Sequence, residues 1–112
     1  MPKLTDKKCL PCEGGVALLD RADAEARMAQ LHPDWKLNTE GVEISRKFKF
    51  KGYNQTMVFV NAVAWIAEAE DHHPDLNVGW GACTVHYSTH AISGLSENDF
   101  ICAAKIDALM KQ

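Results

Sequence analysis

The chain has 112 residues, of which 46% are hydrophobic and 24% charged, values that fit one globular domain and argue against disorder. The formal net charge of -3 leaves no basic surface for nucleic acid, so direct nucleic-acid binding is not expected. No apolar run is long enough to span a bilayer, and the basic residues near the N-terminus are not followed by an apolar signal core. We therefore expect a cytoplasmic protein without membrane contact.

The first predicted element is a helix over residues 20–32. Asp20 is the expected N-cap, and Ala24, Met28 and Leu31 recur at helical spacing. Pro33 ends the helix, because the residue before a proline disfavours helical geometry. Residues 35–37 begin an extended segment, 38–41 carry a turn signal, and apolar residues alternate with polar ones over 42–50. This pattern predicts a half-buried strand and a hairpin.

A second, longer helix is predicted over residues 54–72, where Phe59, Val63 and Ile66 form an apolar stripe that ends before Pro74. Residues 76–80 and 82–90 alternate in polarity and predict two more strands. Residues 96–99 have the form of a capping box that opens a last helix. The order α-β-β-α-β-β-α predicts an α+β two-layer sandwich, a four-stranded antiparallel sheet with three helices on one face.

The four cysteines do not suggest a disulfide framework. Cys9 and Cys12 form a Cys-x-x-Cys pair in a polar segment that is followed by glycines. A structural zinc needs four ligands, and a thioredoxin-like site needs a flanking strand and helix, so neither is indicated. We predict a flexible arm at residues 1–14 with two incidental thiols and no zinc, and a folded domain at 15–112. A metal or redox site is the alternative, while Cys83 and Cys102 fit core positions.

Histidines and carboxylates gather at the end of the second predicted helix. Histidine gives and takes protons near physiological pH. Glu68 lies four residues before His72 on the same helix face, where it would orient that ring and raise its pKa, as would the helix dipole. Asp71 adds a carboxylate. The rings of His72 and His73 are expected to diverge and to flank a small molecule from two directions.

A second polar group lies at the end of the fourth predicted strand, where Ser88 and Thr89 precede His90. The two groups together would supply an acid, a base and hydrogen bonds to a polar heterocycle. The competing interpretations give these residues structural roles. The histidines would then be helix-end or surface residues, Glu68 would belong to a solvated ion pair, and Asp99 would cap a helix. A metal site is less favoured, because adjacent histidines rarely converge on one ion.

The histidine-proline motif and the residues spaced after it resemble a known family signature. The chain resembles the pterin-4a-carbinolamine dehydratases at Glu68, His72, His73, Pro74, Trp80, His90 and Asp99. Segments 88–90 and 94–96 and the order of elements are similar to the family as well, so that the resemblance covers roughly residues 15–110. The resemblance implies the same antiparallel sheet with helices on one face.

The activity implied by the resemblance is dehydration of 4a-hydroxytetrahydrobiopterin to quinonoid dihydrobiopterin, without metal or cofactor. This reaction recycles the pterin used by aromatic amino-acid hydroxylases. The resemblance implies catalytic roles for His72, His73 and His90, and we expect His72 to be a principal acid–base residue. It also implies that the pterin pocket is lined or supported by Glu68, Asp71, Ser88, Thr89 and Asp99.

Two further expectations concern aromatic contacts and assembly. Some family members have an aromatic residue where this chain has Leu76, so pterin stacking is not expected there; Trp80 either compensates or belongs to the core. The resemblance implies a homotetramer, a dimer of dimers. The alternative function is that of a non-enzymatic binding module. Such a module would use its helical face, for example as a dimerisation cofactor for a transcription factor.

Overall fold

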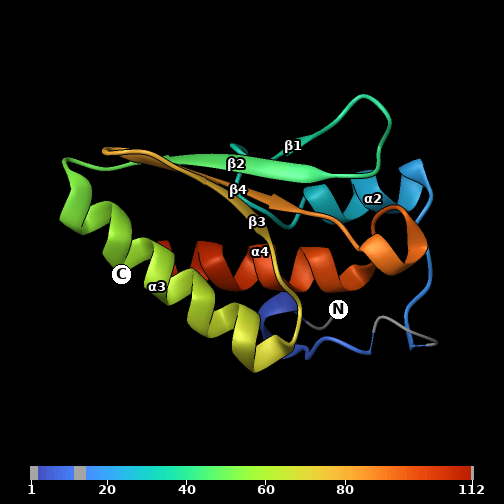
Figure 1. The fold of residues 1–112 in the computed structure, drawn as a ribbon. Helices are drawn as coiled ribbons and strands as arrows, with labels where there is room; N and C mark the ends of the chain where they lie inside the picture. The colour runs from blue at the N-terminus through green and yellow to red at the C-terminus, as the bar shows by residue number, and fades with distance from the viewer. Residues whose placement is uncertain (1–2, 12–14, 112) are drawn as a thin grey trace.

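The computed structural model of the chain describes residues 3–11 and 15–111. Its elements form two layers, with the sheet on one side and the α-helices on the other (Figure 1). In chain order the elements of the described residues are η1 (Leu4–Asp6), α2 (Arg21–Met28), β1 (Lys36–Leu37), β2 (Ile44–Lys49), α3 (Tyr53–Glu70), β3 (Asp75–Val78), β4 (Ala82–Tyr87), η2 (His90–Ile92) and α4 (Glu97–Met110). The predicted fold class and order of elements are confirmed.

The sheet has the strand order β1-β2-β4-β3, and every pairing is antiparallel. β4 lies inside the sheet and pairs along its length with β2, from Tyr87 opposite Ile44 to Ala82 opposite Lys49. Buried residues alternate with half-buried ones along β4. This period of two is typical of a strand with one covered face, and it directs the Tyr87 side chain toward the helices.

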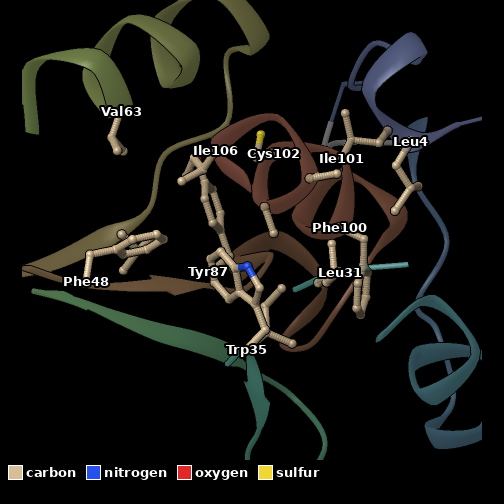
Figure 2. Packing of buried hydrophobic residues seen from close by; sticks show 14 of the residues in the cluster. Leu4, Leu31, Trp35, Phe48, Val63, Tyr87, Phe100, Ile101, Cys102 and Ile106 are labelled. Carbon is tan, nitrogen blue, oxygen red and sulfur yellow. The ribbon is translucent and has the colours of Figure 1, made fainter. Parts of the chain in front are cut away.

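The core lies between the sheet and α4. Phe100, Ile101 and Ile106 of α4 are almost fully buried and join Trp35 and Phe48 in one apolar cluster (Figure 2). Burial of such a side chain stabilises the fold by about 1.5–3 kcal/mol relative to exposure. No helix among the described residues is long and apolar enough to cross a membrane.

α2 and β4 end three to four residues earlier than predicted, and α3 and β3 end two residues earlier. α2 ends at Met28 rather than near residue 32, because the backbone N–H of His32 donates to the Asp107 carboxylate of α4 at 2.9 Å instead of continuing the helix. The strand predicted over 82–90 ends at Tyr87. The Thr89 N–H then donates to the Gly94 carbonyl at 2.7 Å, and the Gly94 N–H donates to the Thr89 carbonyl at 3.3 Å. These two bonds enclose η2, which begins at His90.

The predicted N-terminal arm, residues 1–14, lies partly outside the described residues. Its described part contacts α4, and Leu4 is only 3% exposed within the core. The mobility of the arm and the domain boundary at residue 15 stay predictions.

Candidate functional site

The end of α3 determines where the paired histidines lie. Asp71 adopts the left-handed conformation, with φ 52° and ψ 43°, and donates its N–H to the carbonyl of Glu68 at 3.3 Å. The N–H of His72 donates to the carbonyl of Ala67 at 3.1 Å, which completes the Schellman arrangement that often closes a helix. After this turn His72 is buried, at 5% exposure, and His73 is exposed. The two imidazoles therefore have different environments.

A buried carboxylate connects His72 with the segment that precedes His90. Asp99 Oδ1 lies 2.6 Å from His72 Nε2, and Asp99 Oδ2 accepts hydrogen bonds from Thr89 Oγ1 at 2.8 Å and from the Ser96 N–H at 2.9 Å. Asp99, Thr89 and Ser96 are each at most 1% exposed. The network joins the end of α3, the segment after β4 and the start of α4, so the residues that directly precede His73 and His90 are tied to one carboxylate.

Asp99 also caps α4. The Ser96 side chain accepts the Asp99 N–H while the Asp99 carboxylate accepts the Ser96 N–H, which is the predicted capping box. Capping and pocket support were alternatives for Asp99 in the sequence. In the structure one carboxylate oxygen closes the helix and the other contacts His72. Capping is therefore confirmed, whereas support of a pterin pocket by Asp99 stays a prediction.

Tyr87 covers the other side of the buried histidine. The rings of Tyr87 and His72 are stacked, with centroids 5.4 Å apart and an interplanar angle of 11°. The Tyr87 hydroxyl donates to the His72 carbonyl at 3.4 Å, and burial raises the pKa of this tyrosine. In the sequence Tyr87 is only one residue of the strand predicted over 82–90. The available signal was its hydroxyl, because a buried tyrosine usually needs a hydrogen-bond partner.

Opposing effects set the pKa of His72. Burial disfavours the charged imidazolium and lowers the pKa, whereas the hydrogen bond to Asp99 and the charge of Asp99 raise it. Cys102 and Asp71 act in the same direction as Asp99. The net result is a pKa above the usual 6.5, so His72 keeps its proton to higher pH than an ordinary histidine.

This raised pKa makes the free energy of unfolding depend on pH. The contribution of the His72–Asp99 pair is complete below about pH 6.5, the value for an unfolded histidine, and is lost as the pH rises through the higher pKa of the folded chain. We expect the stability difference between wild type and His72→Gln, measured by urea unfolding, to shrink as the pH is raised. A difference that grows with pH contradicts the assignment.

His90 lies at the surface and lines a small pocket. The pocket has a volume of about 220 Å³ and is lined by Asn38, Val42, Glu43, Ser88, Thr89, His90, Ser93 and Gly94. Sites for drug-sized ligands are usually about 300–1,000 Å³, so this pocket has room for a small ligand or part of one. Neither His72 nor His73 is among its lining residues. That all three imidazoles meet around one hollow stays a prediction.

The carboxylates are arranged differently from the expectation. Asp99, rather than Glu68, lies against Nε2 of His72, and the side chains of Glu68 and Asp71 are exposed at the end of α3. Asp71 ends the helix and adds its charge to the raised pKa of His72. Within the described residues, no three His, Cys, Asp or Glu side chains gather in a way that could hold a metal ion.

Trp80, the aromatic residue that was expected to compensate for Leu76 or to belong to the core, lies far from His72 within the chain. Trp80 is 70% exposed, so it is not a core residue. Its carbonyl accepts a hydrogen bond of 3.0 Å from Thr56 at the start of α3, whereas His72 follows the end of that helix. A helix of 18 residues is about 27 Å long. Trp80 and His72 of one chain therefore lie at opposite ends of α3.

Comparison with known sequences gives matches over most of the chain. The profile of the family described as Pterin 4 alpha carbinolamine dehydratase matches residues 17–109. A protein of Nitrosomonas europaea is 59% identical over 108 residues, which are 96% of this chain and 94% of that protein. A protein of Legionella pneumophila is 50% identical over 107 residues, 96% of this chain and 95% of that protein. Both are named "Putative pterin-4-alpha-carbinolamine dehydratase".

Two solved structures share the fold. A transcriptional coactivator/pterin dehydratase from Brucella melitensis has a TM-score of 0.77 and 28% identity, covering 83% of this chain and 98% of that one. A pterin dehydratase-like protein, described as a RuBisCO assembly factor in the alpha-carboxysome, has a TM-score of 0.59 and 26% identity, covering 70% and 90%. With its fold, its histidine-proline motif and these matches, the chain belongs to the pterin-4-alpha-carbinolamine dehydratase family.

Proposed function

We propose that the protein is a 4a-hydroxytetrahydrobiopterin dehydratase that releases water to give quinonoid dihydrobiopterin. Family membership supports the class of reaction. The observation that carries the proposal is the pair of contacts that the buried Asp99 makes with His72 at 2.6 Å and with Thr89 at 2.8 Å, because these two residues directly precede the exposed His73 and His90. Loss of water by acid–base catalysis requires neither a metal nor a cofactor.

The reaction needs one acid and one base. The bond from C4a to the hydroxyl oxygen breaks as that oxygen takes a proton, and N5 gives up its proton to a second group. We assign these two roles to His73 and His90, because both are exposed and can meet a substrate. General acid or base catalysis of this kind accelerates a reaction by about 10²–10⁴-fold for each group.

Burial changes the role that we assign to His72. At 5% exposure, enclosed by Asp99 and Tyr87, its ring is poorly placed to reach a substrate directly. In this proposal His72 acts in catalysis in two ways: it positions the neighbouring His73, and its protonated ring keeps a buried positive charge next to the proposed site. Exposed carboxylates of Glu68 and Asp71 would accept hydrogen bonds from the pterin ring.

Ser88 and Thr89 support the other side of the proposed site. Both line the pocket that contains His90, and Thr89 is fixed by its hydrogen bond of 2.8 Å to Asp99. A half-buried hydroxyl at Ser88 can donate to or accept from a polar heterocycle. Thr89 in this proposal orients the backbone from which His90 projects.

The proposed activity is tested by the decay of the carbinolamine, followed by its ultraviolet absorbance with and without purified protein. We expect the decay to accelerate in proportion to protein concentration. A rate equal to the spontaneous rate, with protein that is folded by circular dichroism, contradicts the proposal.

Binding to another protein is a second candidate function. The titles of the two solved relatives name a transcriptional coactivator and a RuBisCO assembly factor. In this chain the exposed side chains of Val58 and Trp65 leave apolar surface on α3. The carbinolamine assay distinguishes the two functions, because a binding module without enzymatic activity leaves the decay rate unchanged.

We also propose that the protein self-associates as a homotetramer, a dimer of dimers. Val58 and Trp65 are 68% and 75% exposed and lie seven residues apart, hence on one face of α3. β3 is an edge strand among the described residues, and Val78 on it is 46% exposed. An apolar helix face and an open sheet edge are both suited to a symmetric contact with a second copy.

Trp65→Glu is expected to reduce the mass in solution, because a buried, unpaired charge opposes association through α3. Light scattering measures the mass; the wild type is expected above the 12.4 kDa of one chain and the variant below the wild type. Leu18→Glu is the matched control, since Leu18 is 60% exposed outside α3 and its replacement is expected to leave the mass unchanged. A wild type with the mass of one chain contradicts the proposal.

A cytoplasmic location and a link to an aromatic amino-acid hydroxylase complete the proposed function. Cys9, Cys83 and Cys102 are free thiols, as is usual in a reducing compartment. The link to the hydroxylase follows from the proposed substrate, since dehydration recycles the pterin that such enzymes use.

A further inference from the structure

Two thiols that are far apart in the sequence meet beneath the candidate site. Cys9 precedes α2, and Cys102 lies on α4, where Figure 2 shows its sulfur. Their Sγ atoms are 3.6 Å apart, although the residues are separated by 93 positions. Cys102 is fully buried and Cys9 is half-buried. The thiols predicted to be incidental therefore include one with a specific partner.

The backbone around Cys9 is fixed by hydrogen bonds to side chains of α3 and α4. The Cys9 N–H donates to Glu70 Oε1 at 2.9 Å, and Glu70 is held in turn by Lys105 at 2.7 Å. The next residue, Leu10, receives a hydrogen bond of 2.7 Å from the Asn98 amide and donates its N–H to Asn98 Oδ1 at 2.9 Å. These bonds on both sides of the thiol hold Cys9 against Cys102.

The contact between the two thiols shifts their pKa values in opposite directions. The hydrogen bond between the thiols lowers the pKa of Cys102, although burial acts in the opposite direction, and the Tyr87 hydroxyl and the charge of His72 also lower it. The same bond raises the pKa of Cys9, with burial adding to the effect. Cys102 is therefore the thiol with more thiolate character, which is the form that reacts with oxidants.

We propose that Cys9 and Cys102 are a redox modification site, at which hydrogen peroxide forms a reversible disulfide that ties the N-terminal segment to α4. One thiolate attacks a peroxide oxygen; the O–O bond breaks, and a sulfenic acid and hydroxide form. The second thiol then attacks the sulfenic sulfur, so the S–S bond forms, the S–O bond breaks and water leaves. The hydroxide takes up the proton that the first thiol released, so the two sulfurs are oxidised and the peroxide is reduced to two molecules of water.

The geometry makes this pair suitable for such a bond. The sulfur atoms of a disulfide are about 2.05 Å apart. The Sγ atoms of Cys9 and Cys102, now 3.6 Å apart, must therefore move about 1.5 Å closer together. Cys9 lies outside any helix or strand among the described residues, so this small approach does not require a helix or strand to be distorted at Cys9. In a reducing compartment such bonds are usually transient and redox-sensing. Oxidation of these two thiols does not depend on the proposed pterin chemistry.

The test uses the full chain with Cys12→Ser and Cys83→Ala, which leaves Cys9 and Cys102 as its cysteines. Peroxide treatment, followed by alkylation and trypsin, is expected to give one linked pair of peptides, residues 9–21 and 52–105, that separates on reduction with dithiothreitol. Cys12→Ser/Cys102→Ala, which retains Cys9 and Cys83, is the matched control and is expected to give no link within the chain.

A second measurement avoids substitution in the core. Peptic digestion of the oxidised Cys12→Ser chain separates Cys83 from Cys102, and the link is expected at Cys102. The proposal is overturned if both thiols remain open to alkylation, if they are converted to sulfinic or sulfonic acids, or if the disulfide joins two chains or involves Cys83.

Discussion

Asp99→Ala is expected to lower the free energy of unfolding by about 3–5 kcal/mol, the usual loss when one partner of a buried ion pair is removed. The substitution removes the acceptor of three groups at once: the ring of His72, the hydroxyl of Thr89 and the N–H of Ser96. All three lie in buried residues, and a buried donor without an acceptor costs about 1–3 kcal/mol. Urea unfolding followed by circular dichroism measures the loss.

Glu97→Ala is the matched control, because Glu97 is an acidic residue in the same first turn of α4. Its side chain is 35% exposed and forms ion pairs with Lys7 and Arg27, so its removal is expected to cost about 0–1 kcal/mol. Asp99→Asn keeps the shape but not the charge and is expected to fall between the two. An alanine variant of Asp99 that is as stable as the Glu97 variant contradicts this account.

His73→Ala and His90→Ala are each expected to reduce kcat for carbinolamine dehydration by about 10²–10⁴-fold. Both side chains are exposed, so each variant is expected to unfold within about 0.5 kcal/mol of the wild type. The combination of a large loss of activity with unchanged stability is what separates a catalytic group from a structural one. Stopped-flow absorbance and urea unfolding on the same preparations provide both measurements.

Two other histidines serve as controls. His32→Ala replaces an exposed histidine that follows α2, and its kcat is expected to equal that of the wild type. His72→Ala is expected to lower both kcat and stability, because it removes the partner of Asp99 in the core. If His73→Ala and His90→Ala both keep the wild-type kcat while folded, the proposed roles are wrong.

Local patterns were sufficient to predict the fold. The alternation over 42–50 and 82–90 predicted strands with one covered face, and the structure has them at Ile44–Lys49 and Ala82–Tyr87. Asp20 caps α2 by accepting the Asp23 N–H at 2.8 Å, and the capping box of α4 forms as predicted. Each of these features depends on residues within a few positions of one another, so the sequence contains the information directly.

The arrangement of the site depends on contacts that local patterns do not contain. His72 turns into the core because Asp71 adopts a left-handed conformation, and helices more often close with glycine at that position. Its partner, Asp99, comes from a helix 27 positions further along the chain, whereas the sequence offered Glu68 one turn away. The pairing of Cys9 with Cys102 is similarly long-range, so a Cys-x-x-Cys motif gave no indication of it.

The most direct test of the central claim is a crystal structure of the protein with a bound reduced pterin analogue. Our account predicts that the bicyclic ring lies between the imidazoles of His73 and His90, with C4a and N5 within hydrogen-bonding reach of them, and that His72 stays on Asp99. A pterin bound elsewhere, in contact with neither exposed histidine, would contradict it.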